Sequence, residues 1–599
     1  MAQPLEIFND NVQKFEEQAS TLRKKYSNLS VMRIIAFIVS LVVFVYLAND
    51  RSYWGVVIVL LTFPFAFGLL IRYHNRIGYR MNHYKLLKKI NQQEIQKANG
   101  DLGQFDQGTE FNENSHPYTN DLDIFGKNSL FQLLNRTTTV SGKAMLAKWL
   151  KKAATKETIL DRQEAVKELT SSVEWRQDFQ ASGMHFQDEK NEIHVLLEWI
   201  KEETEIKNRS LYLLASWAMP ILLFTILGLV AFKVITIYYF FGILAINGII
   251  LRSFYDPVKD ITDKAYKSTK TLKSYASLIR MIEESNFHSK ELTSLKANFN
   301  HDNFKASAVV GQLQRLLDFL LSRANMLYGL IDLLLLMDIH LLLRAEKWRK
   351  ENKEEVSKWF DSISEFETIN SMAGFAYANP EYAYPVISDN THYLNAQEMG
   401  HPLIKSASRI SNDFRIDEGK GEVIIVTGSN MSGKSTFLRT IGVNLVLALA
   451  GAPVCSKAFE VSNIQVFTSM RTQDDLEESI SSFYAELKRI RQLLDLLEDG
   501  DQPVLFMLDE ILKGTNSQDR HTGGVALVKQ LSKTNAVGLI STHDLDLGNT
   551  SKTYENVKNF SFNSKIINDE IIFDYKLTEG VCQSFNASKL MQKIGIQIE

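Results

Sequence analysis

The chain has 599 residues, and its 67 Lys and Arg nearly balance its 70 Asp and Glu, which gives a formal net charge of −3. Proteins that depend mainly on non-specific phosphate contacts carry a basic excess, so any binding of nucleic acid here needs a local basic patch. Hydrophobic residues make up 45% of the chain, which excludes low-complexity disorder. The two cysteines exclude a disulfide framework and a cysteine-rich zinc site.

Four apolar runs occur in two pairs within the N-terminal half of the chain. The first pair covers residues 31–48 and 54–71, and the second covers residues 211–232 and 234–251. A helix needs about 20 apolar residues to cross a hydrocarbon core of about 30 Å. A short polar segment joins the members of each pair, and in the second pair it is Lys233 alone. The pattern predicts two transmembrane helical hairpins, against the alternative of buried helices in a large soluble core.

The stretch 313–343 is equally rich in leucine but follows a different pattern. Charged residues such as Arg323 and Asp338 interrupt it. Its apolar residues repeat with the spacing of one helix face, which is typical of a water-soluble helix with a buried stripe. The predicted stripe consists of Leu313, Leu316, Leu317, Leu320 and Leu321.

Basic residues flank both predicted hairpins on the side away from their short turns. Arg23, Lys24 and Lys25 precede the first hairpin, and Arg252 and Lys259 follow the second. Lys and Arg accumulate on the cytoplasmic side of membrane proteins. We therefore expect a multi-pass protein of the cell (inner) membrane, with both termini and the whole C-terminal part in the cytoplasm.

A phosphate-binding motif follows a β-branched run in the C-terminal third. Residues 422–427 are predicted to form a buried strand, residues 428–436 contain the full GxxxxGK[ST] pattern, and a helical pattern continues from Phe437. In this context backbone N–H groups and a helix N-terminus surround phosphate oxygens. Lys434 is expected to bridge the β- and γ-phosphates, and Ser435 to ligate Mg²⁺. The expected nucleotide-binding residues are Gly428, Ser429, Asn430, Met431, Ser432, Gly433, Lys434, Ser435 and Thr436.

Two further strand-like runs end in residues that suit ATP hydrolysis. Residues 504–508 lead into Asp509 and Glu510, and residues 537–541 lead towards His543. Asp509 is expected to hold Mg²⁺, Glu510 to polarise the attacking water, and His543 to sense or stabilise the γ-phosphate. The three strand ends together predict a P-loop ATPase that uses ATP and Mg²⁺. The expected catalytic residues are Lys434, Glu510 and His543, and the expected metal ligands are Ser435 and Asp509.

Segments between and before these strands narrow the class. Residues 481–487 (SSFYAEL) and 509–517 (DEILKGTNS), together with the phosphate-binding loop itself, resemble the DNA mismatch repair MutS family. Upstream, residues 130–137 are similar to the start of that family's helical core domain, and residues 375–380 to its junction into the ATPase domain. The resemblance spans about residues 120–599.

The resemblance implies a dimer with composite nucleotide sites. Ser481 matches the serine that reaches the nucleotide bound by the partner subunit, and Thr515 and Asn516 match an interface motif. By the same resemblance, ATP binding and hydrolysis would change how helical arms grip DNA. The family's N-terminal mismatch-reading domain is not visible in the sequence, because the first hairpin and a linker take its place. The Phe-x-Glu triplet at residues 111–113 lacks the family's surrounding residues and is interpreted as a coincidence.

The sequence thus predicts a multidomain α and α/β protein. Residues 1–119 form an N-terminal region with the first hairpin and a linker. Residues 120–390 form a MutS-like helical core, which the second hairpin interrupts, and residues 391–599 form a P-loop ATPase domain with an α/β fold.

The predicted function is that of a membrane-anchored MutS-like ATPase, which works as a homodimer and couples ATP hydrolysis to binding of mismatched or branched DNA. The expected partners are ATP, Mg²⁺, DNA and a lipid bilayer crossed by four helices. The alternatives are a component of an ATP-driven membrane transporter and a nucleotide-binding membrane scaffold. The absence of an LSGGQ-like signature argues against the transporter. Glu510 argues against the scaffold, because a pure nucleotide binder needs no water-activating carboxylate.

Overall fold

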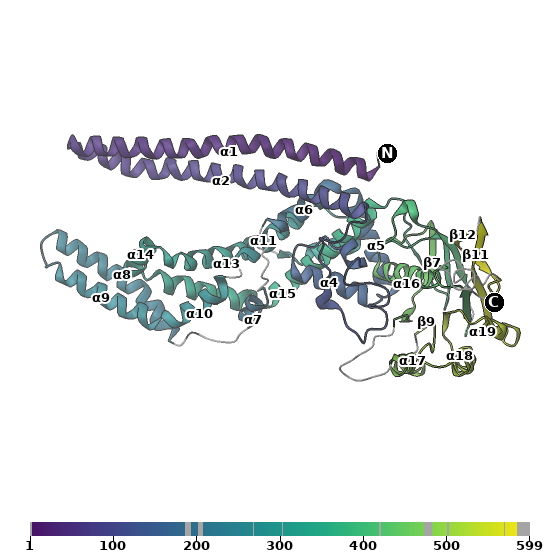
Figure 1. Cartoon of the computed structure of the whole chain (residues 1–599). Coiled ribbons are helices and arrows are strands. Elements are labelled where there is room, and N and C mark those ends of the chain that lie inside the picture. Colours follow the sequence, from purple (N-terminus) through teal and green to yellow (C-terminus); the bar gives the residue numbers. More distant parts are fainter. Residues whose placement is uncertain are drawn as a thin grey trace.

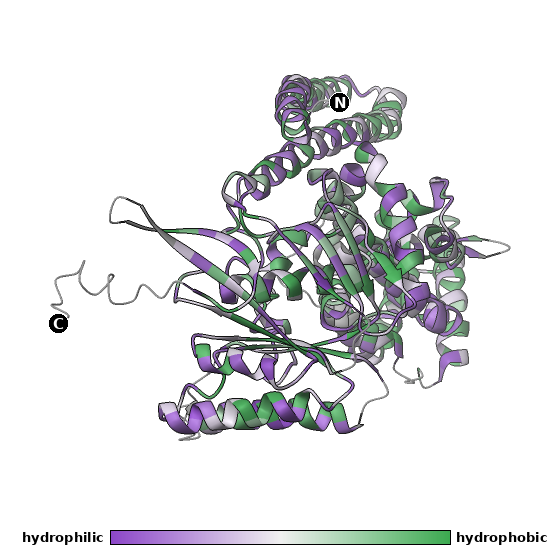
Figure 2. Cartoon of the chain, turned by 90° about the vertical axis from the view of Figure 1, so that its right-hand side faces the viewer, coloured by the Kyte–Doolittle hydropathy of each residue, from purple (hydrophilic) through white to green (hydrophobic). Residues whose placement is uncertain are grey.

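The computed structural model describes residues 3–185, 193–201, 206, 208–266, 269–301, 304–417, 421–471, 482–499, 502–567 and 570–583. These residues form two elongated helical arms and a C-terminal α/β domain (Figure 1). The arms extend side by side from the α/β domain, and their free ends lie on the left of Figure 1. Seen from the α/β end, the N-terminal arm is a separate pair of helices beside the rest of the molecule (Figure 2).

The N-terminal arm consists of α1 (Pro4–Asn49) and α2 (Tyr53–Ala98). Each helix has 46 residues, which corresponds to a length of about 70 Å at 1.5 Å per residue. The chain reverses between them at Arg51, which has a left-handed φ of 52°. The most apolar 18-residue segment of each helix contains no buried residue. The two predicted spans are thus the outer parts of much longer helices.

The second arm is the helical core. It contains α3 (Leu130–Leu134), α4 (Val140–Lys151), α5 (Lys156–Ser171), α6 (Val173–Met184), α7 (Ile193–Lys201), α8 (Arg209–Ala231), α9 (Tyr238–Ser253), α10 (Tyr255–Tyr266), α11 (Thr269–Glu284), α12 (Lys290–Ala297), β1 (Asn300–His301), β2 (Phe304–Lys305), α13 (Ala306–Leu321), α14 (Met326–Leu335) and α15 (Met337–Ala378). Helices α4, α5 and α13 pack directly against α15, which connects the α/β domain with the outer part of the arm (Figure 1). Trp359, Phe366 and Phe375 of α15 are among the largest fully buried side chains.

Buried polar pairs fix the inner half of the N-terminal arm to this core. Glu94 of α2 accepts two hydrogen bonds of 2.7 Å from the guanidinium of Arg136, and both side chains are less than a tenth exposed. Asn91 of α2 and Gln177 of α6 exchange amide hydrogen bonds of 2.9 and 3.1 Å. Breaking a buried ion pair leaves an uncompensated charge, which is strongly unfavourable. These pairs therefore hold α2 in one orientation on the core.

Helices α8 and α9 form the second predicted hairpin, with a longer turn than expected. The turn covers residues 232–237, so the prediction that Lys233 alone connects the helices is wrong. A single residue is too short to bridge the 8–10 Å that typically separates packed helix axes. Among the described residues, α1, α2 and α8 are long and apolar enough to cross a membrane by length and composition. Helix α9 passes the same test only together with the first part of α10, from which it is bent by 52°.

The leucine-rich stretch after residue 313 is not one continuous helix. Leu313, Leu316, Leu317 and Leu320 of α13 are buried, which confirms most of the predicted stripe, whereas Leu321 is half-buried. The chain then breaks at the short helical turn η2 (Ser322–Ala324) and again at Leu336, which has a left-handed φ of 51°. Between these two breaks lies the separate apolar helix α14.

The α/β domain contains a six-stranded sheet of order β12-β11-β6-β10-β9-β8 and a four-stranded sheet of order β3-β7-β4-β5. In the larger sheet all neighbours pair in parallel except β12, which is antiparallel to β11. Strand β6 is buried along its whole length, as is typical of parallel sheets covered on both faces. The strands are β3 (Val386–Ser388), β4 (Leu394–Met399), β5 (Asn412–Ile416), β6 (Val423–Gly428), β7 (Ala458–Ser462), β8 (Gln465–Ser469), β9 (Val504–Asp509), β10 (Val537–Thr542), β11 (Val557–Ile567) and β12 (Glu570–Glu579), and the helices are α16 (Lys434–Ala450), α17 (Ser482–Asp499), α18 (Ser517–Leu531) and α19 (Leu545–Gly548).

Helix α15 supplies a hydrogen bond that a proline removes from α8. Pro220 has no N–H, so the carbonyl of Ser216, four residues earlier, lacks its helical donor. Nε2 of His340 lies 3.0 Å from that carbonyl oxygen, and the imidazole ring lies 5.1 Å from the ring of Trp217. With Nε2 protonated, His340 donates to the carbonyl and ties the second hairpin to α15.

We expect His340→Phe to destabilise the second arm by about 1–2 kcal/mol, because the carbonyl of Ser216 loses its donor while an aromatic ring is kept. Pro220→Ala restores the helical N–H, so the same change should cost less in a Pro220→Ala background. Thermal unfolding midpoints of both single variants and the double variant in detergent solution measure this difference. Equal losses in the two backgrounds would contradict the assigned role of His340.

Candidate active site

The carboxyl ends of β6, β10 and β9 meet at one edge of the larger sheet. The three strands are neighbours in this order and run parallel. The glycine-rich loop follows β6, while Asp509 ends β9 and Thr542 ends β10. Open α/β sheets bind their ligands at the carboxyl ends of such strands. The structure thus brings the three predicted strand ends together.

The loop between β6 and α16 packs so closely that two of its positions require glycine. Gly433 has a φ of 104°, and a Cβ atom there would lie 3.0 Å from Cδ1 of Tyr575. A Cβ atom at Gly428 would lie 2.7 Å from Oγ of Ser432 and 2.9 Å from the carbonyl oxygen of Phe562. Helix α16 begins directly after this loop, so the partial positive charge of its N-terminus lies beside it.

The side chain of Lys434 is folded into the loop. Its Nζ donates to the carbonyl oxygens of Gly428, at 2.8 Å, and Ser429, at 3.0 Å. Burial lowers the pKa of Lys434, and the nearby carboxylates of Glu510 and Asp509 oppose this shift. Among the described residues, the buried Oγ of Ser432 has no hydrogen-bond partner. An unpaired hydroxyl beside an ammonium group and a helix N-terminus fits a phosphate ligand such as the triphosphate of ATP.

Asp509 and Glu510 occupy different environments at the end of β9. Asp509 accepts a hydrogen bond from the hydroxyl of Ser541, which ties β9 to β10. Glu510 has a left-handed φ of 49°, and its backbone N–H donates to the carbonyl of Ser541 at 3.0 Å. Its carboxylate lies 3.8 Å from Nδ1 of His543 and 3.8 Å from Nζ of Lys513. Strained backbone at a non-glycine residue is typical of functional sites, and here it aims Glu510 at the cavity described below.

Glu486 of α17 supports the segment that follows Glu510. Its carboxylate accepts a hydrogen bond from the backbone N–H of Leu512, another residue with a left-handed φ, of 55°. Burial raises the pKa of Glu486, while the backbone N–H groups of Leu512, Lys513 and Gly514 oppose that rise. The sequence identified Glu486 only as part of a resembling segment. In the structure it holds the strained turn that carries Glu510.

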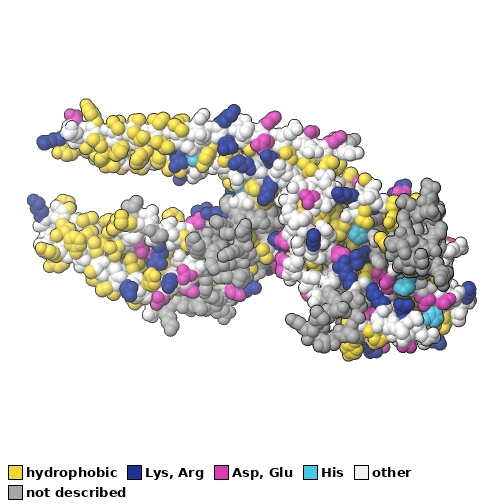
Figure 3. Space-filling view, viewed as in Figure 1, with side chains coloured by type: hydrophobic (Ala, Val, Ile, Leu, Met, Phe, Trp, Pro, Cys, Tyr) yellow, Lys and Arg dark blue, Asp and Glu magenta, His cyan; other side chains and the backbone are white. Residues whose placement is uncertain are grey.

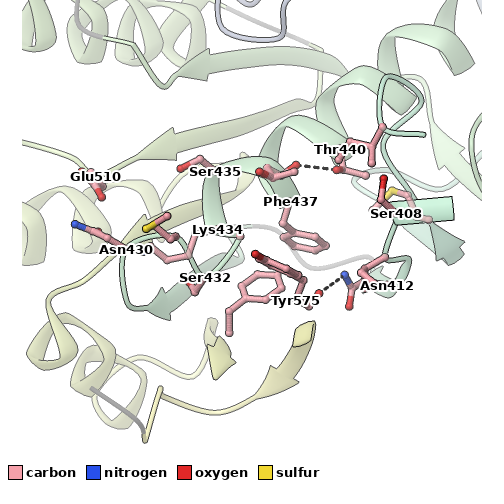
Figure 4. A pocket seen from close by; sticks show the side chains of 17 residues that line it. Ser408, Asn412, Asn430, Ser432, Lys434, Ser435, Phe437, Thr440, Glu510 and Tyr575 are labelled. Carbon is pink, nitrogen blue, oxygen red and sulfur yellow. Dashed lines mark hydrogen bonds between the residues drawn. The ribbon is translucent and has the colours of Figure 1, made fainter. Parts of the chain in front are cut away.

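A cavity of about 520 Å³ opens beside the loop (Figure 4). Loop residues and Glu510 contribute polar groups to its lining. The rings of Phe437 and Phe562 meet edge to face with centroids 5.6 Å apart. Polar groups of the loop together with aromatic rings suit the phosphates and the flat base of a nucleotide. The apolar residues of the lining outside the loop are Met399, Ile404, Ile410, Phe437, Phe562 and Tyr575.

Asn412 of β5 holds Tyr575 in this cavity. Its Nδ2 donates to the carbonyl of Tyr575 at 3.0 Å (Figure 4). Its Oδ1 accepts from the N–H of Leu577 at 2.9 Å. These two bonds fix a backbone that has a left-handed φ of 53° at Tyr575. The sequence identified Tyr575 only as part of a segment that resembles the end of the family's ATPase domain, and it gave Asn412 no role, because no local pattern links residues that lie so far apart in the chain.

The described residues of the predicted site fall into three groups. The first group lines the cavity and consists of the loop residues from Asn430 to Thr436 and Glu510. The second group is Gly428 and Ser429, whose carbonyls accept hydrogen bonds from Lys434. The third group is Asp509 and His543, which lie at the neighbouring strand ends. The predicted Ser481 lies outside the described residues.

A parallel sheet with this loop and these carboxylates at its carboxyl edge defines a P-loop ATPase domain. The family models agree: MutS domain V matches residues 424–596, and MutS domain III matches residues 113–376. MutS domain V is the ABC-type ATPase domain, so residues 424–596 carry an ATPase domain of this type. Together the two models span more than two thirds of the chain, which therefore belongs to the MutS family.

Curated relatives share part of the chain. It is 33% identical over 237 residues to the DNA mismatch repair protein MutS of Finegoldia magna, covering 38% of this chain and 27% of that protein. It is 31% identical over 240 residues to MutS protein homolog 4 of Mus musculus, covering 38% and 24%. It is 29% identical over 250 residues to MutS of Thermotoga sp., covering 41% and 31%. The chain thus spans about a quarter of the length of the curated relatives it matches.

We expect Glu510→Gln to lower kcat for ATP hydrolysis by about 10²–10⁴-fold while ATP binding is retained, because the amide cannot accept a proton from water. Steady-state phosphate release and equilibrium binding of ATP measure the two effects. Glu498→Gln, which changes an exposed carboxylate on α17, is the matched control and should leave both unchanged. Turnover near the wild-type rate in Glu510→Gln would exclude Glu510 as the general base.

We expect Tyr575→Ala to raise KM for ATP by about 2–10-fold with little change in kcat, because one aromatic wall of the cavity is lost. Tyr575→Phe keeps the ring and should stay close to wild type. Rates measured over a range of ATP concentrations separate KM from kcat. A fall in kcat at constant KM would show that Tyr575 does not contact the nucleotide in the way we expect.

Proposed function

We propose that this protein is a membrane-anchored ATPase of the MutS type, which works as a homodimer and couples Mg²⁺-dependent ATP hydrolysis to binding of mismatched or branched DNA. The observation that carries the membrane part is the position of the two hairpins. Their apolar segments are more than 100 residues apart in the sequence, yet both lie at the end of the molecule away from the ATPase domain (Figure 3).

Exposure of these segments supports embedding in a bilayer. Trp54 and Leu61 of the first hairpin, and Leu214 and Ile221 of the second, each expose more than 60% of their surface. Water-soluble monomers rarely expose large continuous apolar patches, and two such bands at one level match a hydrocarbon layer. Basic residues on the ATPase side of both bands favour a cytoplasmic ATPase domain and cytoplasmic termini in the cell (inner) membrane.

The geometry of the strand ends supports the following assignment of roles. Lys434 contacts the β- and γ-phosphates, with backbone N–H groups of residues 428–436 around them. Ser435 and Asp509 hold Mg²⁺, which neutralises phosphate charge when bound. Glu510 accepts a proton from the attacking water, and His543, whose Nδ1 lies 3.8 Å from Glu510, orients that carboxylate or contacts the γ-phosphate.

An exposed apolar residue of the phosphate-binding loop supports dimer formation at the nucleotide site. Met431 lines the cavity and exposes 81% of its surface. A second subunit covering this loop would remove its side chain from water. By the resemblance to MutS dimers, Ser481 of each subunit then contributes to the nucleotide site of the other.

The DNA part of the proposal depends on the relatives, two of which carry the name DNA mismatch repair protein. The Phe-x-Glu triplet does not contribute to it. Phe111 packs against Phe125 and Phe131 with ring centroids 6.0 and 5.8 Å apart, and Glu113 pairs with Lys151 at 2.5 Å. Any preference for a DNA structure therefore has to come from other surfaces of the arms.

We expect the purified full chain, reconstituted into phosphatidylcholine vesicles, to float with the vesicles after an alkaline wash. Mismatched or branched DNA should change its ATPase rate or KM at least about two-fold relative to homoduplex DNA at fixed salt concentration. The Glu510→Gln variant controls for contaminating ATPases. An ATPase rate and KM that are the same with homoduplex, mismatched and branched DNA would refute the proposed DNA binding and leave the ATPase activity. Failure of the protein to float with the vesicles would refute the proposed membrane anchoring.

A further inference from the structure

We infer that α14 also lies within the bilayer, as a third apolar helix beside α8 and α9, and that its outer face contacts lipid hydrocarbon. The inference depends on the proposed membrane anchoring. It concerns residues 326–335, however, which lie in the stretch that the sequence pattern assigned to a water-soluble helix. Figure 1 shows α14 beyond α13, alongside α8 in the outer part of the second arm.

A buried asparagine joins α14 to the second hairpin. Asn247 of α9 is fully buried, and its Nδ2 donates to the carbonyl of Leu333 at 2.9 Å. Leu333 lies in the last turn of α14, where carbonyl groups have no helical donor. A polar side chain in an apolar helix is costly unless it is hydrogen-bonded. The one strongly polar residue within the apolar run of α9 thus donates a hydrogen bond to α14.

The depth of this contact follows from helix geometry. Asn247 lies five residues before Arg252, which marks the basic end of α9, and Ser216 lies seven residues after Arg209, which marks that of α8. At 1.5 Å per residue these positions are about 8 and 10 Å inside the apolar segments.

Asn247 and Ser216 both form hydrogen bonds with residues close to one reversal of the chain, at Leu336. Leu333, the partner of Asn247, precedes the reversal at Leu336, and His340, the partner of Ser216, follows it. Two independent contacts therefore place the reversal at a similar depth, about 10 Å beyond the basic ends of the hairpin.

The backbone at this reversal is buried and hydrogen-bonded, as an apolar environment requires. Non-helical backbone is tolerated inside a membrane only where protein covers it and its polar groups are paired. Leu336 is fully buried, and its N–H donates to the carbonyl of Asp332 at 2.7 Å. The N–H of Asp338, at the start of α15, donates to Oδ1 of Asp332 at 2.8 Å.

Two of the charges that interrupt the leucine-rich stretch, Arg323 and Asp338, are paired with each other, and Asp338 is buried. Nε of Arg323 lies 2.8 Å from Oδ2 of Asp338, and the hydroxyl of Tyr328 donates to the other carboxylate oxygen at 2.7 Å. The guanidinium also lies over the ring of Tyr255 at 5.4 Å. These residues indicated a solvated helix in the sequence, but in the fold they are consistent with an apolar exterior.

The large exposed side chains that the structure describes on α14 are apolar. Met326, Leu330 and Ile331 expose 81%, 56% and 47% of their surfaces. Asp332, the one acidic or basic residue in this helix, is buried. Since α14 packs on α8 and α9, its exposed face continues the apolar bands of those helices. The same lipid that surrounds the hairpin is therefore the occupant that fits this face.

Spin labels on three helices test the inference in the full chain reconstituted into phosphatidylcholine vesicles. A nitroxide is attached to Leu330→Cys on α14, and to Leu214→Cys on α8, five residues inside Arg209. A third label is attached to Leu160→Cys on α5, an exposed residue of the helical core domain near the ATPase domain. Both native cysteines are buried, and labelling of the unchanged protein gives the background. Power saturation compares collisions with oxygen, which concentrates in lipid, and with a water-soluble nickel chelate.

We expect oxygen collisions to exceed nickel collisions several-fold at residues 330 and 214, and the reverse at residue 160, with ATPase activity unchanged by the labels. Nickel access at 330 with oxygen preference at 214 would overturn the inference and leave the membrane anchoring intact. Little access of either reagent at 330 would mean that protein, such as a second copy, covers α14, and would also overturn it. Nickel access at 214 would refute the membrane anchoring itself.

Discussion

The burial of α15 towards both of its ends is the constraint on which the arrangement of the other parts depends. Its 42 residues span about 63 Å, so this one helix sets the distance between the ATPase domain and the reversal of the chain at Leu336. At the inner end the ring of Phe375 lies 5.6 Å from the ring of Tyr382, centroid to centroid. At the outer end His340 contacts the carbonyl of Ser216 in α8. Between them the buried carboxylate of Glu367 accepts hydrogen bonds from Thr138 and Thr139 and fixes the start of α4. Contacts at both ends and in the middle leave α15 little freedom to bend.

The nucleotide site is physically continuous with this helix. Helix α16 begins at the phosphate-binding loop and ends against the core, where the carbonyl of Leu449 accepts from the N–H of Ala154 at 3.2 Å. Helices α4 and α5, on either side of Ala154, both pack on α15. A shift of α16 on nucleotide binding would therefore displace α4 and α5, which pack on α15. This continuity identifies α16, α4 and α5 as the elements through which coupling to α15 passes.

The sequence predicted the parts of the site that depend on residues adjacent in the chain, and it missed parts that depend on residues far apart in the chain. The strand ends with Lys434, Asp509 and Glu510 were predictable, because motif and flanking strand are adjacent in the chain. The apolar wall of the cavity was not, since Asn412 and Tyr575 are 163 residues apart and meet only through the fold. Helix α14 was missed for another reason. Arg323 and Asp338 look solvated in a linear pattern, and their mutual pairing appears only when the chain reverses at Leu336.

Anchoring both arms in one bilayer would restrict the motions that ATP hydrolysis can drive. Sliding α8 along the membrane normal by one turn would carry three or four apolar side chains across the boundary, at a cost of about 1.5–3 kcal/mol each. Lateral separation of the arms exposes no apolar surface to water, because lipid fills the space between them. The buried pairs of α2 with Arg136 and Gln177 hold the inner half of the first arm to the core, so lateral motion must be greatest at the outer ends. A rotation of about 5° at the ATPase end of α15 would move its far end by about 5 Å, in the plane where movement is least costly.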